Sequence, residues 1–346
     1  MIDRIICLFY DDLVVQHMFS NPYNSRKPMP SFFGMVLIAI VPLLTTSTAW
    51  GQEQSITKPP IIDVAFSPDG KSLVSCSQEG LQVFSWPKLL LKKTVQVSFA
   101  NLQCFEFSPN GDRLAIGGGN PSEEGIVEVF SWPECKSQIK LSGHDDSIMS
   151  VVWQGNKNLV SAGLDRLLIL WDLETQKRVR SYQGHSRGIS SACILKNEIM
   201  VTGGYDQSVR VWDVKSGKLV RSLNQHSKPV NSIAVCPVSA VRPMVATAAG
   251  DRSIRFWQPT IGRMMRYVRL ESEPLDIAWI NESRVVASCI DGKARVVDTE
   301  NVKVIQTIQV IKGWAYAVAV HPSDGTIAIA GSAGLLKRVS LQNKKM

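Results

Sequence analysis

The feature that most constrains this fold is a segment that recurs three times with fixed internal spacing. Each copy runs from a histidine through a turn aspartate to a tryptophan: His144, Asp165, Trp171; His185, Asp206, Trp212; His226, Asp251, Trp257. The aspartate precedes the tryptophan by six residues every time, and the tryptophans are 41 and 45 residues apart. Between these markers the chain alternates apolar and polar residues, as half-buried strands do. A period of about 40 residues built from short strands predicts a ring or array of small β-sheets.

Weaker copies of the same segment flank these three. Residues 63–87 and 104–133 each begin with a similar strand and a Ser-Pro-x-Gly turn, and Phe84 and Phe130 align with the tryptophan position. Residues 285–298 place Val297 there, and residues 317–341 close the series. The result is seven units over about 61–341, none of which shows a sustained helical period. The sequence therefore predicts an all-β fold.

Several of these residues together resemble the WD-repeat family. They are a Gly-His dipeptide at 143–144 and 184–185, the turn aspartate, and a Trp-Asp ending at 171–172 and 212–213. The resemblance implies a single seven-bladed β-propeller of four-stranded blades. In the last unit we expect strands at about 316–320, 326–330 and 334–341, which leaves no room for a fourth. We therefore expect residues 53–58 to supply that outer strand, so that the ring is closed by the N-terminal strand.

Twelve residues of the three regular units form a recurring set. In the WD-repeat family similar sets form a hydrogen-bond chain from aspartate to histidine to hydroxyl to indole, which we call the clamp. Its members here are His144, Ser161, Asp165, Trp171, His185, Thr202, Asp206, Trp212, His226, Thr247, Asp251 and Trp257. A catalytic triad would need one exposed nucleophile with its base and an oxyanion hole. Recurrence at one register in three units instead favours a structural device, so we predict no catalytic residue.

The loops that carry the clamp histidine and aspartate supply the candidate binding residues. In propellers of this family such loops open on one rim of the ring. Besides Asp145 and Asp146, these loops carry a set that we predict to be a partner-binding rim: Arg166, Arg187, Tyr205, Lys228 and Arg252. A basic rim with one aromatic side chain suits an acidic protein partner. The alternative is an ordinary set of solvated turn residues, and further basic residues are scattered elsewhere, including Lys92 and Arg263.

Metal and cofactor chemistry is not predicted. Apart from Cys7, the chain has six cysteines but no C-x-x-C pair, and an oxidising compartment would allow one disulfide without singling out a pair. Beyond His17 and the three clamp histidines, only His321 remains, which we expect in a turn. Gly117 to Gly119 is interpreted as a loop insertion, because no Lys-Ser/Thr and no helix follow it. We therefore expect no metal and no cofactor.

Residues 1–51 are typical of an export signal. Arg26 and Lys27 precede an apolar run at 32–44, and small residues follow it, so we expect cleavage after Gly51, with a site after Ala49 as the second choice. The run is too short for a stable membrane span. The long segment before it suggests translation from Met18 or Met29. The propeller domain would then be 52–346, in a periplasmic or secreted protein.

Charge and composition limit the function further. The net charge is +8, from 38 Lys and Arg against 30 Asp and Glu, and no basic run of the kind that nucleic-acid binding requires is visible. We predict a non-catalytic exported scaffold, a monomeric ring that binds a protein partner through its loops. Two alternatives stay open: a cytoplasmic WD-repeat scaffold whose leader is wrongly assigned, which could bind nucleic acid or an assembly machine, and a propeller enzyme acting in the central channel.

Overall fold

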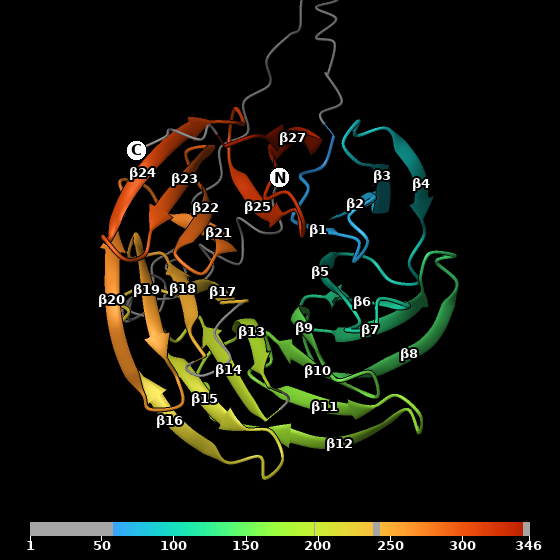
Figure 1. Ribbon diagram of the computed structural model, residues 1–346. Helices are drawn as coiled ribbons and strands as arrows, with labels where there is room; N and C mark the ends of the chain where they lie inside the picture. Colours follow the sequence, from blue (N-terminus) through green and yellow to red (C-terminus); the bar gives the residue numbers. More distant parts are fainter. Residues whose placement is uncertain (1–57, 197, 238–242, 342–346) are drawn as a thin grey trace, which may run out of the picture. The chain divides into compact units, whose positions relative to one another are not determined.

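The computed structural model describes residues 58–196, 198–237 and 243–341. The chain divides into two units, residues 1–57 and residues 58–346, and every described residue lies in the second. In that unit seven antiparallel sheets follow one another around a ring (Figure 1). The predicted seven-bladed β-propeller is confirmed. The predicted signal segment and its cleavage sites lie outside the described residues.

Each blade is one consecutive stretch of chain. The strands are β1 Asp63–Phe66, β2 Ser72–Ser77, β3 Gly80–Ser85 and β4 Leu91–Val95; β5 Leu102–Phe107, β6 Arg113–Asn120, β7 Glu124–Ser131 and β8 Ser137–His144; β9 Ile148–Gln154, β10 Asn158–Gly163, β11 Leu168–Asp172 and β12 Lys177–Tyr182; β13 Ile189–Leu195, β14 Ile199–Gly204, β15 Val209–Asp213 and β16 Leu219–Leu223; β17 Val230–Val235, β18 Val245–Ala249, β19 Ser253–Gln258 and β20 Arg263–Arg269; β21 Pro274–Asn281, β22 Arg284–Cys289, β23 Lys293–Asp298 and β24 Lys303–Gln309; and β25 Ala315–Val320, β26 Ile327–Gly331 and β27 Leu336–Val339. A short 3₁₀ turn, Ser332–Gly334, precedes β27.

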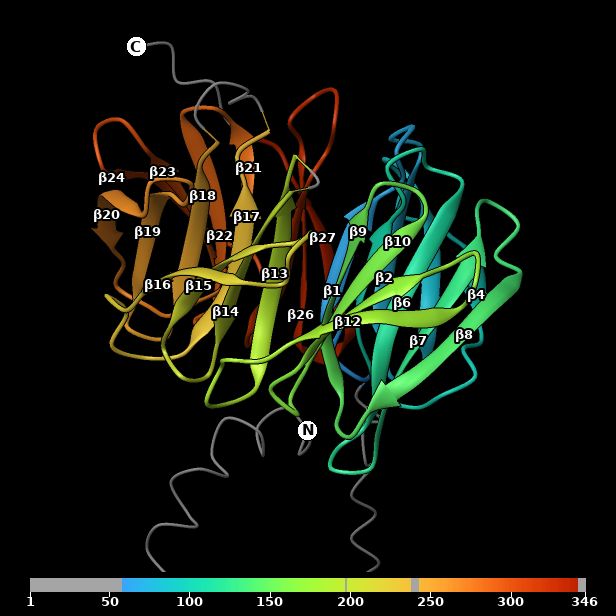
Figure 2. The same ribbon diagram turned by 90° about the horizontal axis from the view of Figure 1, so that it is seen from below.

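The strands of a blade run from the centre of the ring to its circumference, as Figures 1 and 2 show. In the described residues the seventh sheet has the three strands β25, β26 and β27. The fourth strand expected from residues 53–58 lies outside the described residues, except for Lys58, which is not in a strand. Just after it, the Ile61 N–H donates to Gly331 O at 3.1 Å, which joins the start of blade one to blade seven.

The hydrophobic core is divided among the interfaces between neighbouring blades. Second strands such as β2 and β18 are buried along their whole length, because another blade covers each face of the sheet. Outer strands are exposed at most positions, as in β4 and β16. The largest fully buried side chains include Trp212, Trp257 and Phe256. Burying a large apolar side chain stabilises the fold by about 1.5–3 kcal/mol.

Strand register confirms how the weak repeats align with the strong ones. In each of the first six blades the pairing of the third and fourth strands shifts just before one position. That position holds Phe84, Phe130, Trp171, Trp212, Trp257 and Val297 in blades one to six. The shift is a β-bulge, with one unpaired residue on the outer strand. The alignment of Phe84, Phe130 and Val297 with the tryptophans was therefore right.

The glycine run in blade two is not a loop, contrary to the sequence interpretation. Gly117, Gly118 and Gly119 lie in β6 and pair with β7, because the inserted residues lengthen both strands of this hairpin. Gly117 is required by packing. A Cβ there would lie 2.8 Å from both the Cys104 Sγ and an Ile148 methyl group. The insertion thus extends a hairpin in which close packing leaves no room for a side chain at Gly117.

Blades seven and one also meet through a cluster of rings. His321 lies in the turn after β25, as expected, and its Nε2 lies 3.1 Å from Gly70 O of blade one. Its ring stacks on Trp86 and contacts the edge of Phe66. Arg338 of blade seven lies over the Trp86 ring of blade one, 5.6 Å from the ring centroid. His321 therefore helps to join the first and last blades.

Candidate functional site

The structure places the twelve clamp residues in three hydrogen-bond chains. In blade three the Trp171 indole N–H donates to Ser161 Oγ at 2.8 Å, which lies 2.7 Å from His144 Nε2. The opposite nitrogen, Nδ1, lies 2.9 Å from an Asp165 carboxylate oxygen. A neutral imidazole satisfies every group: the hydroxyl donates to Nε2, and Nδ1–H donates to the carboxylate. Buried indole and imidazole groups would otherwise lose about 1–3 kcal/mol each.

Blades four and five repeat this geometry closely. His185 Nε2 lies 2.7 Å from Thr202 Oγ1, which accepts from Trp212 Nε1 at 2.9 Å. In blade five the corresponding distances, at Thr247 Oγ1, are both 2.8 Å. The hydroxyls of Ser161, Thr202 and Thr247 belong to residues with no exposed surface. None of the three is accessible to a substrate as a nucleophile.

Each clamp aspartate also ties two loops together. Asp206 accepts the N–H of Ser186, next to the clamp histidine, and the N–H of Ser208 across its own turn. Asp165 and Asp251 hold their neighbouring loops in the same way. The loop between blades and the turn between second and third strands are therefore fixed to each other. The clamp therefore holds two loops in place, in addition to satisfying the buried indole N–H.

The clamp carboxylates are acidic for a physical reason. Burial alone would raise their pKa values, but the hydrogen bonds from the paired histidine and from loop N–H groups outweigh it. The pKa values of Asp165, Asp206 and Asp251 are therefore all below the ordinary range. In blades four and five the serine hydroxyl two residues later contributes as well. These carboxylates stay ionised wherever the fold is intact near neutral pH.

The predicted rim residues all lie in the loops that the clamps hold. Arg166 and Arg252 each follow a clamp aspartate and have φ angles of 70° and 61°. Arg187 and Lys228 each lie two residues after a clamp histidine. All four cations are exposed, and Tyr205 is half-buried. The structure thus brings the five rim residues to one face of blades three to five, which we call the clamp face.

Acidic residues occupy the adjoining part of the clamp face. Glu123 and Glu124 lie at the tip of the β6–β7 hairpin of blade two, and Asp145 and Asp146 precede β9. Asp146 accepts the N–H groups of Ser122 and Ser147, so it holds the neighbouring loop. The rim is therefore dipolar: basic over blades three to five and acidic on the blade-two side.

The sequence analysis missed a set of hydrogen bonds near the centre of the ring. A side chain on the first strand of one blade accepts the backbone N–H of the next blade's first strand. The pairs are Asp63 with Phe105, Ser150 with Ala192, Ser191 with Ile233, and Asp276 with Val318. Each pair is 42 residues apart. The 41-residue spacing of the two serines was a signal that could have revealed them.

Blade two uses a different group for the same purpose. Its equivalent position is Cys104, and Glu106 instead accepts the N–H of Trp153 at 2.8 Å. Burial raises the pKa of Glu106 to about 7, against the opposing effect of that hydrogen bond. This carboxyl group therefore titrates near neutrality, although its neighbours in the ring are serine hydroxyls and aspartates.

A second missed set lies at the circumference. A cation on the outer strand of one blade donates to carbonyl groups in the turn before the next blade's outer strand. The pairs are Lys93 with Glu134, Arg180 with Ser216, Arg221 with Thr260, and Arg266 with Thr299 and Glu300. Several outer-strand cations are thus structural links between blades. They could not be separated from solvated charges in the sequence.

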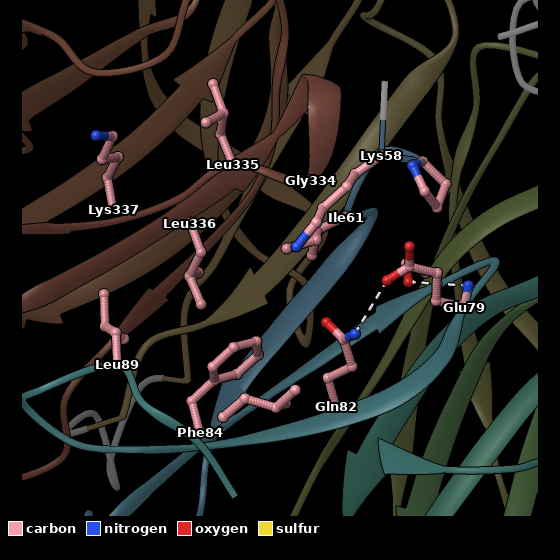
Figure 3. Close-up of a pocket in the computed structure, with 13 residues that line it drawn as sticks. Lys58, Ile61, Glu79, Gln82, Phe84, Leu89, Gly334, Leu335, Leu336 and Lys337 are labelled. Atoms are coloured by element: carbon pink, nitrogen blue, oxygen red, sulfur yellow. Dashed lines mark hydrogen bonds between the residues drawn. The ribbon is translucent and has the colours of Figure 1, made fainter. Parts of the chain in front are cut away.

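A pocket of about 310 Å³ lies where blade seven meets blade one. Figure 3 shows Leu336 of β27 and Phe84 of β3 lining it from the two blades, with Lys58 and Glu79 at its margin. Gln82 Nε2 donates to Glu79 Oε2 at 3.1 Å on this wall. The pocket lies beside β27, the outermost strand of its sheet among the described residues.

Within residues 58–341, where described, no group of three or more His, Cys, Asp or Glu side chains is placed to hold a metal ion. In the same part of the chain, no helix is long and apolar enough to cross a membrane. None of the six cysteines in this part of the chain forms a disulfide bond. Cys135 lies in the loop between β7 and β8, and Cys236 lies one residue beyond β17.

Fold and clamp together define a propeller of the WD-repeat type, and comparison with known proteins agrees. The family described as "WD domain, G-beta repeat" matches residues 51–81, 135–172, 176–213 and 217–258. The last three matches each end at the third strand of a clamped blade. The resemblance to the WD-repeat family is thus confirmed.

Two curated relatives share part of this sequence. The chain is 33% identical over 125 residues to the UBP9-binding protein bun62 of Schizosaccharomyces pombe, covering 34% of this chain and 22% of the relative. It is 26% identical over 128 residues to the WD repeat-containing protein AAC3 of Dictyostelium discoideum, covering 35% of this chain and 26% of the relative. The similarity therefore spans about a quarter of each relative. One of these names describes a binding protein.

Proposed function

We propose that this protein is a non-catalytic scaffold that binds an acidic segment of a protein partner on the basic side of its clamp face. The observation that carries the proposal is the position of Arg166, Arg187, Lys228 and Arg252 in loops that the clamps fix. Ordering loops before binding reduces the entropy cost of association. Complementary charge then accelerates encounter and excludes basic partners.

The clamps themselves support a role other than catalysis. Their hydroxyls are buried, and each is occupied on both sides by an indole N–H and an imidazole nitrogen. The name of bun62 as a binding protein agrees with a scaffold role for the shared repeats.

We also propose that the propeller acts outside the cytoplasm, as a single ring, after removal of residues 1–51. The charged segment, apolar run and small residues of that region support export. N-terminal sequencing of the protein purified from its native cells tests this directly. A mature N-terminus near Gln52 is expected, and retention of residues 18–51 would favour the cytoplasmic alternative.

The binding proposal is tested by affinity capture followed by mass spectrometry. The tagged wild type is compared with a variant carrying Arg187→Glu and Arg252→Glu. Both side chains are exposed, so the unfolding free energy should change by less than about 0.5 kcal/mol. Recovery of acidic partners should fall sharply. A matched control reverses Lys140 on the outer strand of blade two and Lys136, which directly precedes that strand. Equal recovery by all three proteins would show that the clamp face is not the binding surface.

A further inference from the structure

The outer edge of blade four carries a patch that the clamp face does not include. It combines four exposed aliphatic side chains with exposed cations. The aliphatic residues are Val179, Leu219, Val220 and Ile261, whose exposed fractions are 54%, 41%, 49% and 59%. The cations are Arg178, Lys215, Lys218 and Arg263. We call these eight residues the blade-four patch.

Inter-blade contacts make the patch continuous. Arg180 of β12 donates to Ser216 O in the β15–β16 turn, which places β12 against blade four. Arg221 of β16 donates to Thr260 O at 3.4 Å, next to Ile261 in the β19–β20 turn. Figure 1 shows β12, β16 and β20 one after another along the circumference. Three blades therefore contribute to one surface with blade four at its centre.

In blades three and four the bulge of the outer strand adds an aliphatic residue to this surface, whereas the bulge residues of blades five and six are Met265 and Ile305. Val179 and Val220 are the unpaired bulge residues of blades three and four. The same position holds Lys92 in blade one and Gln138 in blade two. The bulge is thus a feature of the fold, but blades one and two have no aliphatic side chain at this position.

The charge around the patch is mainly positive. Segments 176–182, 214–223 and 259–270 contain nine Lys and Arg residues and no Asp or Glu, and the neighbouring Asp213 lies near Lys215 and Arg180. Charged residues on edge strands commonly prevent sheet-to-sheet aggregation, but that purpose is served by either sign. A surface with this excess of positive charge attracts an anionic partner.

We propose that the blade-four patch binds the surface of an anionic lipid bilayer. Aliphatic side chains flanked by Lys and Arg suit the boundary between headgroups and acyl chains. There the aliphatic groups are buried from water and the cations are attracted to anionic headgroups. The one exposed aromatic side chain of these three segments is Tyr267, and Arg255 already lies over its ring, so a nucleic acid would find little free aromatic surface on which to stack its bases. Protein interfaces are depleted in Lys, of which the patch has two. This contact is peripheral and independent of the clamp-face proposal.

Vesicle flotation of the full-length protein tests this inference. The probes are vesicles of phosphatidylcholine and vesicles in which one third of the lipid is phosphatidylglycerol. Wild type should float with the anionic vesicles at low salt, and binding should weaken at high salt. The variant with Lys215→Glu and Lys218→Glu should bind at least about tenfold more weakly. The variant with Leu219→Ser and Ile261→Ser should also lose binding, although its charge is unchanged.

The matched control is Lys136→Glu with Lys140→Glu, because Lys136 of blade two is the counterpart of Lys218. All variants retain residues 1–57, so any contribution of that segment cancels. Equal binding of the control and the patch variants would overturn the proposal. So would equal binding of wild type to the two vesicles, or no effect of the serine variant. If the patch variants lost binding to polyuridylate but not to anionic vesicles, the surface would instead be a nucleic-acid site.

Discussion

Blades five and six are neighbours in the ring, yet they stabilise the same turn with different chemistry. In blade five Asp251 accepts from His226, and the chain continues through Thr247 to Trp257. In blade six strand register places Ala287 where Thr247 lies and Val297 where Trp257 lies. Asp291 keeps the aspartate position and forms a bidentate pair with Arg295, at 2.9 and 2.6 Å.

An arginine at this position is common to both blades, which explains how the replacement works. Arg255 of blade five lies 3.5 Å from an Asp251 oxygen but is secondary to the histidine. Without the histidine, Arg295 takes both carboxylate oxygens and is only 1% exposed. In blade six the hydroxyl and the indole are lost together with the histidine, so none of these three groups is left buried without its partners. The aspartate survives because the turn still needs it.

The largest expected effect is at the clamp indole. Trp212→Ala should lower the unfolding free energy by roughly 3–5 kcal/mol, because it removes a buried aromatic side chain and leaves the Thr202 hydroxyl oxygen without its indole donor. Urea denaturation measures the loss. Trp212→Phe should cost less, since Phe84 and Phe130 fill this position in blades one and two. A near-wild-type denaturation midpoint for Trp212→Ala would contradict the clamp's role in stability.

The next effect distinguishes the two arginines. Arg295→Met should cost about 2–4 kcal/mol, because it removes the buried guanidinium that donates to both Asp291 carboxylate oxygens. Arg255→Met should cost about 1 kcal/mol or less, because His226 still holds Asp251. Denaturation of both variants at neutral pH decides the comparison. Equal losses of unfolding free energy in the two variants would show that Arg295 does not hold Asp291 in the way that His226 holds Asp251.

A smaller, pH-dependent effect should follow from the clamp carboxylates. Their folded pKa values lie below the unfolded value of about 3.9, so their stabilisation is complete above that pH and is lost as the pH falls below it. Asp206→Asn should be less stable than wild type at neutral pH, and the gap should narrow in acid. Unfolding free energies from about pH 6 to about pH 3 test this. Parallel curves would mean that Asp206 does not contribute to acid sensitivity.

Much of the fold could be predicted because the residues that define each repeat lie close together in the sequence. The interval from Asp165 to Trp171 is one strand and its turn, so it survives as a fixed spacing. The alignment of Phe84 with the tryptophans also succeeded, because flanking strands preserve the register. The prediction of a loop at Gly117 was wrong, because a run of glycines occurs both in loops and in strands whose backbone is closely packed. Only the contact with Cys104 separates the two.

The repeat spacing alone predicts the number of blades, the strand order within each blade and the residues of the three clamps, because all of these depend on intervals of about 40 residues or fewer. Tertiary structure decided which side chains join one blade to the next. Asp63 and Ser150 serve neighbouring blades 42 residues away. Arg221 and Lys218 are both exposed, but Arg221 donates to a carbonyl group of the next blade. Such roles depend on where closing the ring places each strand, which decides which residues of one type link two blades.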